Sequence, residues 1–121
     1  MLVNLCTSLT ELGELDEALE VARRAYPLVE QAGRVLDFLD PCALLLFKRG
    51  RIDDAARMLG RTDMRYAAGN FQRETVKQKL RDRLMLSLRD TLSLDELCRL
   101  MKEGEALSDE DSTRLALREQ A

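Results

Sequence analysis

Apolar residues recur at steps of three and four along most of the chain, the spacing that places them on one face of an α-helix. The first such stripe consists of Leu2, Leu5, Cys6 and Leu9. Apolar stripes and helix-start signals predict further helices over about residues 18–26, 39–48, 52–59, 71–91, 94–102 and 109–118. No segment shows the sustained alternation with β-branched residues that is typical of a strand. The pattern predicts an all-α protein of five to seven helices.

Two segments repeat the same order of residue types. Gly13–Glu20 and Gly50–Arg57 both read Gly, charged, aliphatic, Asp, acidic, Ala, and they start 37 residues apart. A period near about 34 residues is typical of solenoids built from helical hairpins. We expect the Gly to close one helix, the Asp to cap the next, and the Ala to let the two helices approach closely. The predicted caps are Asp16 and Asp53, and the predicted close-contact residues are Ala18 and Ala55.

Pro41 interrupts the first apolar stripe of the second unit. Proline is well tolerated only in the first turn of a helix, because in the interior it removes a backbone hydrogen bond. We therefore expect this helix to begin at about Leu39 or Asp40, after a separate short turn. Its partner would run from about Ile52 to Leu59, and the less regular stretch that follows would be a loop or a helix extension.

The second half of the chain carries several helix-boundary signals. The longest candidate helix runs from Phe71 to about Thr91. Ser93 and Glu96 form a capping box, which predicts a short helix after them. Ser108 is placed like a second N-cap, which predicts a final helix after it. The glycines interpreted as isolated helix ends are Gly60, Gly69 and Gly104.

The first unit, Leu2–Glu30, resembles the tetratricopeptide repeat. The residues that carry the resemblance are Leu2, Leu5, Cys6, Leu9, Gly13, Ala18, Ala22 and Ala25, with Leu where the family has aromatic residues. The second unit is a degenerate repeat that keeps Gly50, Ala55 and Leu59. The resemblance implies an α-α superhelix, whose stacked hairpins form the core and leave a groove for a partner. It implies one domain over residues 1–121, with two hairpins in 1–60 and a long helix and two short C-terminal helices in 61–121.

A second resemblance covers the rest of the chain. Asp54–Gly60, Leu92–Leu97 and Gly104–Asp111 resemble the C-terminal region of bacterial multidomain regulators that combine a STAND-type ATPase with a LuxR-type DNA-binding domain. In that family the helical tail is taken as a sensing or scaffolding segment. The resemblance implies a cytoplasmic interaction module of a signalling protein or transcription regulator. Because the chain starts inside a helical pattern, we also expect it to be a fragment of a longer protein.

The composition limits the kinds of partner that the chain can bind. The formal net charge is −3 and there is no polybasic run, which argues against nucleic acid as a direct partner. The longest apolar run, Ala43–Phe47, is too short to span a membrane. The basic residues of the long helix alternate with acids, so we interpret them as a solvated face. They are Lys77, Lys79, Arg81, Arg83 and Arg89.

No catalytic residue, cofactor or metal site is predicted. The chain has no His, and its three cysteines lie far apart among apolar residues. We expect reduced, buried thiols rather than a metal site or a nucleophile, because neither has the partner residues it needs. These are Cys6, Cys42 and Cys98. The numerous acids are explained by caps and first helical turns.

A protein or peptide partner, or another domain of the parent chain, is the expected ligand. In tetratricopeptide-like units the first helix of each hairpin lines the groove. The positions expected to face it are Asn4, Thr7, Glu11, Asp40, Leu44, Phe47 and Lys48. The run Ala43–Phe47 is apolar on all sides, so it must be buried on more than one face, in the core or against a second copy. A homodimerisation scaffold is therefore the alternative function.

Overall fold

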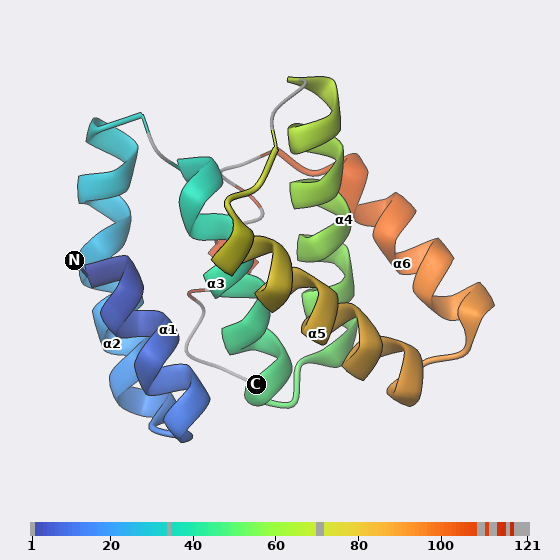
Figure 1. Ribbon diagram of the computed structural model, residues 1–121, viewed down its shortest axis with the longest axis horizontal. Helices are drawn as coiled ribbons and strands as arrows, with labels where there is room; N and C mark the ends of the chain where they lie inside the picture. The colour runs from blue at the N-terminus through green and yellow to red at the C-terminus, as the bar shows by residue number, and fades with distance from the viewer. Residues whose placement is uncertain are drawn as a thin grey trace.

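The computed structural model describes residues 2–33, 35–69 and 72–108, together with residues 111, 114, 115 and 117. Over these residues the chain forms six helices and no strand, which confirms the predicted all-α fold (Figure 1). The helices are α1 (Leu2–Leu12), α2 (Leu15–Gln31), α3 (Val35–Lys48), α4 (Ile52–Ala68), α5 (Thr75–Thr91) and α6 (Leu94–Glu105).

The first four helices form two hairpins that pack side by side. α1 pairs with α2, α3 pairs with α4, and α3 contacts both helices of the first hairpin. A glycine with a positive φ closes the first helix of each pair, Gly13 at 85° and Gly50 at 84°. In the first turn the Gly13 N–H donates to the Thr10 carbonyl at 3.1 Å and the Glu14 N–H to the Leu9 carbonyl at 2.9 Å. Gly50 and Arg51 repeat these two bonds, so both turns are Schellman motifs.

The two aspartates after these turns are not caps, and this prediction is wrong. Asp16 and Asp53 lie in the first turns of α2 and α4, because those helices already begin at Leu15 and Ile52. The residues at the cap positions make no side-chain cap bond. A Schellman turn leaves too few residues between the helices for the aspartates to precede the second helix. Their carboxylates instead favour the helix dipole.

The small residues predicted at the hairpin contacts are confirmed. Ala18 and Ala55 are both completely buried. In the first hairpin the helices come close enough for the Cys6 thiol to donate to the Ala18 carbonyl at 3.6 Å. Cys42 is also buried, and burial raises the pKa of both thiols. Cys98 is exposed on α6, so the prediction of a buried thiol is wrong there.

Pro41 lies inside α3, and the prediction that the helix begins after a separate turn is wrong. An interior proline costs about 3 kcal/mol because it removes a hydrogen bond and crowds the preceding turn. Phe38 and Leu39, in the turn before it, are completely buried. Burying two such side chains gains about 3–6 kcal/mol, enough to keep the turn helical. The run that follows, Ala43–Leu46, is buried within the chain by the neighbouring helices.

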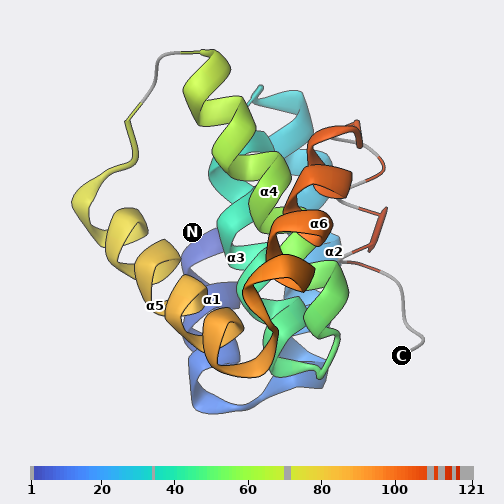
Figure 2. The ribbon, with the colours of Figure 1, turned by 90° about the vertical axis from the view of Figure 1, so that its right-hand side faces the viewer.

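α5 and α6 follow each other in sequence like a third hairpin but do not pack as one. The Ser93 capping box is confirmed and opens α6 as predicted. However, α6 packs mainly on α4 and scarcely touches α5 (Figure 2). α5 begins at Thr75, later than predicted, and crosses α3 and α4 on another side of the molecule. The predicted start at Phe71 lies outside the described residues.

Two glycines at the crossing of α4 and α6 explain their close packing. Gly60 and Gly104 are helical and buried, so their interpretation as isolated helix ends is wrong. A Cβ atom on Gly60 would lie 2.1 Å from the Met101 carbonyl oxygen. One on Gly104 would lie 1.8 Å from the Arg57 carbonyl oxygen. Only glycine at both positions lets the two backbones come this close. The stretch after Gly60 continues α4 to Ala68.

The predicted last helix is described only in part. The Asp111 N–H donates to the Ser108 hydroxyl at 3.0 Å, as expected of the Ser108 cap. The bounds of this helix, at about Asp109 and Arg118, lie outside the described residues. The Leu117 carbonyl accepts hydrogen bonds from the Arg23 guanidinium at 2.9 and 2.6 Å. This contact ties the C-terminal segment to α2.

Candidate partner-binding groove

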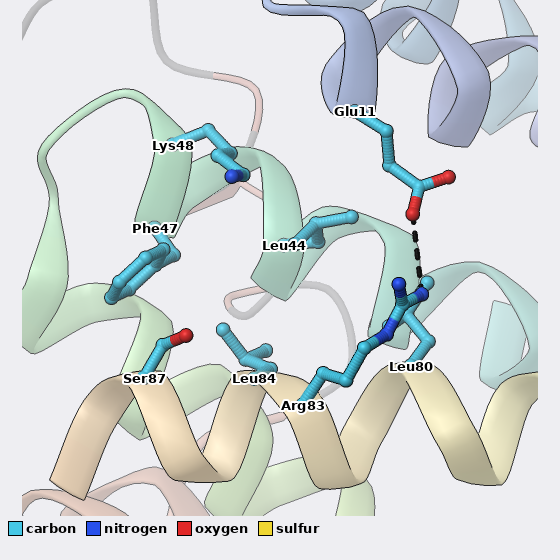
Figure 3. Close-up of a pocket in the computed structure, with 8 residues that line it drawn as sticks. All are labelled: Glu11, Leu44, Phe47, Lys48, Leu80, Arg83, Leu84 and Ser87. Carbon is cyan, nitrogen blue, oxygen red and sulfur yellow. Dashed lines mark hydrogen bonds and ion pairs between the residues drawn. The ribbon is translucent and has the colours of Figure 1, made fainter. Parts of the chain in front are cut away.

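A groove of about 320 Å³ lies between α1, α3 and α5 (Figure 3). α3 contributes three side chains, α5 contributes four, and α1 contributes one. The lining residues are Glu11, Leu44, Phe47, Lys48, Leu80, Arg83, Leu84 and Ser87. This volume is at the small end of the range for ligand sites. It suits one or two anchoring side chains of a partner better than a whole helix.

Four of the seven predicted partner-binding residues line this groove. They are Glu11, Leu44, Phe47 and Lys48. Thr7 is partly buried and is not among the lining residues. The side chain of Asn4 lies outside the described residues. Asp40 does not face outward as predicted, because its carboxylate is buried in an ion-pair network, and it is not among the lining residues.

The apolar part of the groove is firmly built into the core. Leu44 of α3 is only 8% exposed, and Leu80 and Leu84 of α5 are buried. Phe47 is partly buried and packs against the core. Leu80 and Leu84 are one helical turn apart, so both reach α3 from the same face of α5. Side chains held in this way offer a preformed apolar surface to a partner.

The polar side chains of the groove are more exposed. The Arg83 guanidinium pairs with the Glu11 carboxylate at 3.2 Å, which links α5 to α1 across the groove (Figure 3). Both side chains are exposed, 68% for Arg83 and 44% for Glu11. An ion pair this exposed contributes little, about 0–1 kcal/mol, and can exchange partners readily. Among the described lining residues, Lys48 is the one charged side chain without an ion pair.

An ion-pair network holds the start of α5 beside the groove. The Arg73 Nε donates to Asp40 Oδ2 of α3 at 2.6 Å, and its Nη2 donates to Asp63 Oδ1 of α4 at 2.7 Å. Arg81 of α5 pairs with the same Asp63 at 2.6 Å. The Arg73 guanidinium also stacks over the ring of Tyr66 at 4.3 Å, a cation–π contact. The network joins α3, α4 and α5 at one point and so fixes one wall of the groove.

Asp40 and Arg73 are the most buried pair of this network, 2% and 7% exposed. Burial raises the pKa of the Asp40 carboxyl, and the hydrogen bond and charge of Arg73 oppose this rise. Removing one member of such a pair leaves an uncompensated buried group. The role of Asp40 that the geometry supports is therefore to position α5.

The α5 side of the groove was not predicted. Leu80, Arg83, Leu84 and Ser87 line it, whereas the basic residues of this helix were interpreted as a solvated face. Arg81 departs from that interpretation because it is partly buried against Asp63. The leucines at 80, 84 and 88, spaced four residues apart, are the sequence signal that marks the inward face of α5. Nothing in the sequence indicates that this face meets α3.

The arrangement of the groove suits binding. It combines a fixed apolar surface with exposed charges at its edge, the usual form of a recognition site. The described residues contain no group of three or more His, Cys, Asp or Glu side chains placed to hold a metal ion. In the part of the chain that the structure describes, no helix is both long and apolar enough to cross a membrane.

The comparison with known families agrees with the hairpins. A family model for the tetratricopeptide repeat matches residues 2–24 and 40–61, which lie within α1–α2 and α3–α4. These matches and the all-helical structure support a tetratricopeptide-like domain. No curated protein and no solved structure matches the chain. Tetratricopeptide repeats generally mediate protein–protein interaction, and the family is generally non-catalytic.

Proposed function

We propose that this chain is a non-catalytic module that binds a protein or peptide partner in the groove between α1, α3 and α5. One observation carries the proposal. The positions that the repeat pattern assigns to partner contact on α1 and α3 include Glu11, Leu44, Phe47 and Lys48, and these four share one groove. A preformed apolar surface lowers the entropic cost of binding, since its side chains are already ordered.

The finer form of the proposal is a cytoplasmic interaction module of a bacterial signalling ATPase or transcription regulator. It is supported by the resemblance of Asp54–Gly60 and Gly104–Asp111 to the tails of such regulators. In this setting the partner is another protein or another domain of the parent chain, with no direct contact to nucleic acid or membrane. Sequencing the parent gene tests this form, because the resemblance requires a nucleotide-binding or DNA-binding domain in the same product.

The groove itself is tested by selecting displayed peptides on the purified chain and measuring the affinity of the selected peptides in solution. We expect Leu44→Ala and Phe47→Ala to weaken binding about tenfold or more, because each removes apolar surface from the groove. Leu28→Ala is the matched control, since Leu28 is an exposed leucine of α2 outside the groove. Circular dichroism confirms that each variant remains folded. If all three variants lost the same affinity, or if the selected peptides bound all three as tightly as the unaltered chain, the groove would be rejected as the binding site.

A homodimerisation scaffold is the competing function, and it depends on the apolar run Ala43–Phe47. Four of these five residues are buried within the chain, and Phe47 is partly buried. The run exposes only parts of Leu44 and Phe47, which line the groove and are too small by themselves to form a stable dimer interface. Light scattering at increasing concentration separates the two functions: the groove proposal expects the monomer mass, 13.8 kDa. A stable dimer whose formation is lost in Phe47→Ala would favour the scaffold.

A further inference from the structure

The edge of the groove carries more positive than negative charges, and only some of these charges are paired. Glu11 carries the one negative charge among the described lining residues, and Lys48 and Arg83 carry two positive charges. Glu11 neutralises Arg83 through the 3.2 Å ion pair. Lys48 has no such partner within the described groove, so the empty groove presents a net positive charge to a ligand.

The cations reach the groove from two different helices, Lys48 from α3 and Arg83 from α5 (Figure 3). In this view Leu44 lies between them, and Leu84 lies beside Arg83 on α5. The Ser87 hydroxyl also points toward the groove, beside Phe47. A ligand that fits must therefore place an apolar side chain over the leucines and an acceptor of hydrogen bonds toward the cations. A carboxylate, the anionic group that protein side chains carry, forms strong charge-assisted hydrogen bonds with both Lys and Arg.

We infer that the groove selects an acidic amphipathic segment of a protein partner, and that a carboxylate of this segment replaces Glu11 at Arg83. The inference rests on the proposed function and adds the chemistry of the partner. Glu11 then has two effects: it orients Arg83 in the free protein and competes with the ligand in the complex. The exchange is easy because the Glu11–Arg83 pair is exposed and weak. Lys48 attracts the same segment without competition from a neighbouring carboxylate in the groove.

This arrangement predicts opposite effects for two charge-neutralising substitutions. Glu11→Gln frees Arg83 and is expected to tighten the binding of an acidic segment about threefold, the scale of an exposed ion pair. Lys48→Gln removes the unpaired cation and is expected to weaken binding about three- to tenfold. Arg83→Gln removes the group that receives the carboxylate and is expected to weaken binding by a similar factor. Simple repulsion by overall charge would not single out groove positions in this way.

The probes are three fluorescein-labelled peptides of about 15 residues, four helical turns, with identical leucines. Their remaining exposed positions carry Glu, Gln or Lys. Fluorescence anisotropy gives the affinity of each peptide for the full chain. We expect the Glu peptide to bind about tenfold more tightly than the Gln peptide, and its affinity to fall as salt screens the charges. The Lys peptide is expected to bind most weakly.

Two controls separate the groove from general charge. Lys79→Gln matches Lys48→Gln by removing a positive charge from an exposed position of α5 outside the groove, and Glu20→Gln matches Glu11→Gln by removing a negative charge from an exposed position of α2. Both should leave the affinity for the Glu peptide within about twofold of the unaltered chain. A Lys79→Gln loss as large as that of Lys48→Gln would overturn the inference, as would a weaker complex with Glu11→Gln.

The outcomes also distinguish this inference from the proposed function. If all three peptides bind with equal affinity and Leu44→Ala weakens their binding, the preference for an acidic segment would be overturned. The groove would remain as the site for a partner. The same conclusion would follow if the Glu peptide did not bind while peptides selected by display bound in the groove. Failure of every peptide, selected ones included, would overturn both.

Discussion

The first two helix pairs and the last pair of this chain fold by different rules. α1–α2 and α3–α4 each pack on the helix that follows in sequence, whereas α5 and α6 part and pack on helices of the second hairpin. The hairpins share a Gly turn and a buried Ala five residues after it. The connection between α5 and α6 has neither. Local turn chemistry thus decides the pairing of the first four helices, and long-range contacts place the last two.

The two long-range placements also differ from each other. α6 rests on α4 through backbone contact at Gly60 and Gly104. α5 is positioned by the charges of Arg73, which precedes it, and of Arg81 within it, and by a leucine stripe along its length. Close backbone packing tolerates almost no change of volume, whereas an ion-pair network depends on complete pairing. Substitutions at the glycine crossing and in the ion-pair network should therefore affect the stability of the chain differently.

Loss of the Arg73 side chain is expected to have the largest effect. Arg73→Met leaves the Asp40 carboxyl buried without its cation, which costs about 3–5 kcal/mol of unfolding free energy. Urea unfolding followed by circular dichroism measures the loss. Arg99→Met is the matched control, because its pair with Glu103 is exposed and should contribute less than about 1 kcal/mol. Equal losses in the two variants would show that the network does not hold α5.

The glycine crossing comes next. Gly104→Ala places a methyl 1.8 Å from the Arg57 carbonyl oxygen, and we expect a loss of about 1–3 kcal/mol despite the better helix propensity of Ala. Gly69→Ala is the control, since Gly69 is exposed with a φ of −87°. Hydrogen exchange should show α6 losing protection before the two hairpins do. Uniform loss over all six helices would contradict the separate docking of α6.

The capping box of α6 tests how much local sequence contributes to this helix. Ser93→Ala removes the acceptor for the Glu96 N–H at 3.2 Å and is expected to cost about 1 kcal/mol. Thermal unfolding is a sufficient measurement. Ser8→Ala, at an exposed position inside α1, should be neutral or slightly stabilising because Ala favours the helix interior. No effect of Ser93→Ala would mean that the glycine crossing alone forms α6.

The smallest expected effect is a pH dependence. Burial raises the folded-state pKa of Asp40 above 3.8, so the folded chain holds this proton more tightly than the unfolded chain. The resulting stabilisation is complete below 3.8 and is lost as the pH rises through the raised pKa. The unfolding free energy of the unaltered chain minus that of Asp40→Asn should fall over this interval. A difference that rises with pH would mean that Arg73 outweighs burial at Asp40.

The sequence by itself determined the parts of this protein that depend on neighbouring residues. The helical stripes, the Gly13 and Gly50 turns, the Ser93 cap and the small contacts at Ala18 and Ala55 were all predicted. The repeat pattern also identified the α1 and α3 side of the groove. Each of these features is set within one or two helical turns, where residue type and spacing fix the geometry.

Only the tertiary structure decided which helix meets which beyond the hairpins. Pro41 lies inside α3 because Phe38 and Leu39 are buried. Gly60 and Gly104, which the sequence suggests as helix ends, lie where α4 and α6 cross. The tertiary structure also brought Arg73 to Asp40, and with it α5 to the groove. The glycine crossing and the Arg73–Asp40 pair join residues about 30 to 50 positions apart, and no local propensity specifies such contacts because their energy comes from complementary shape and charge.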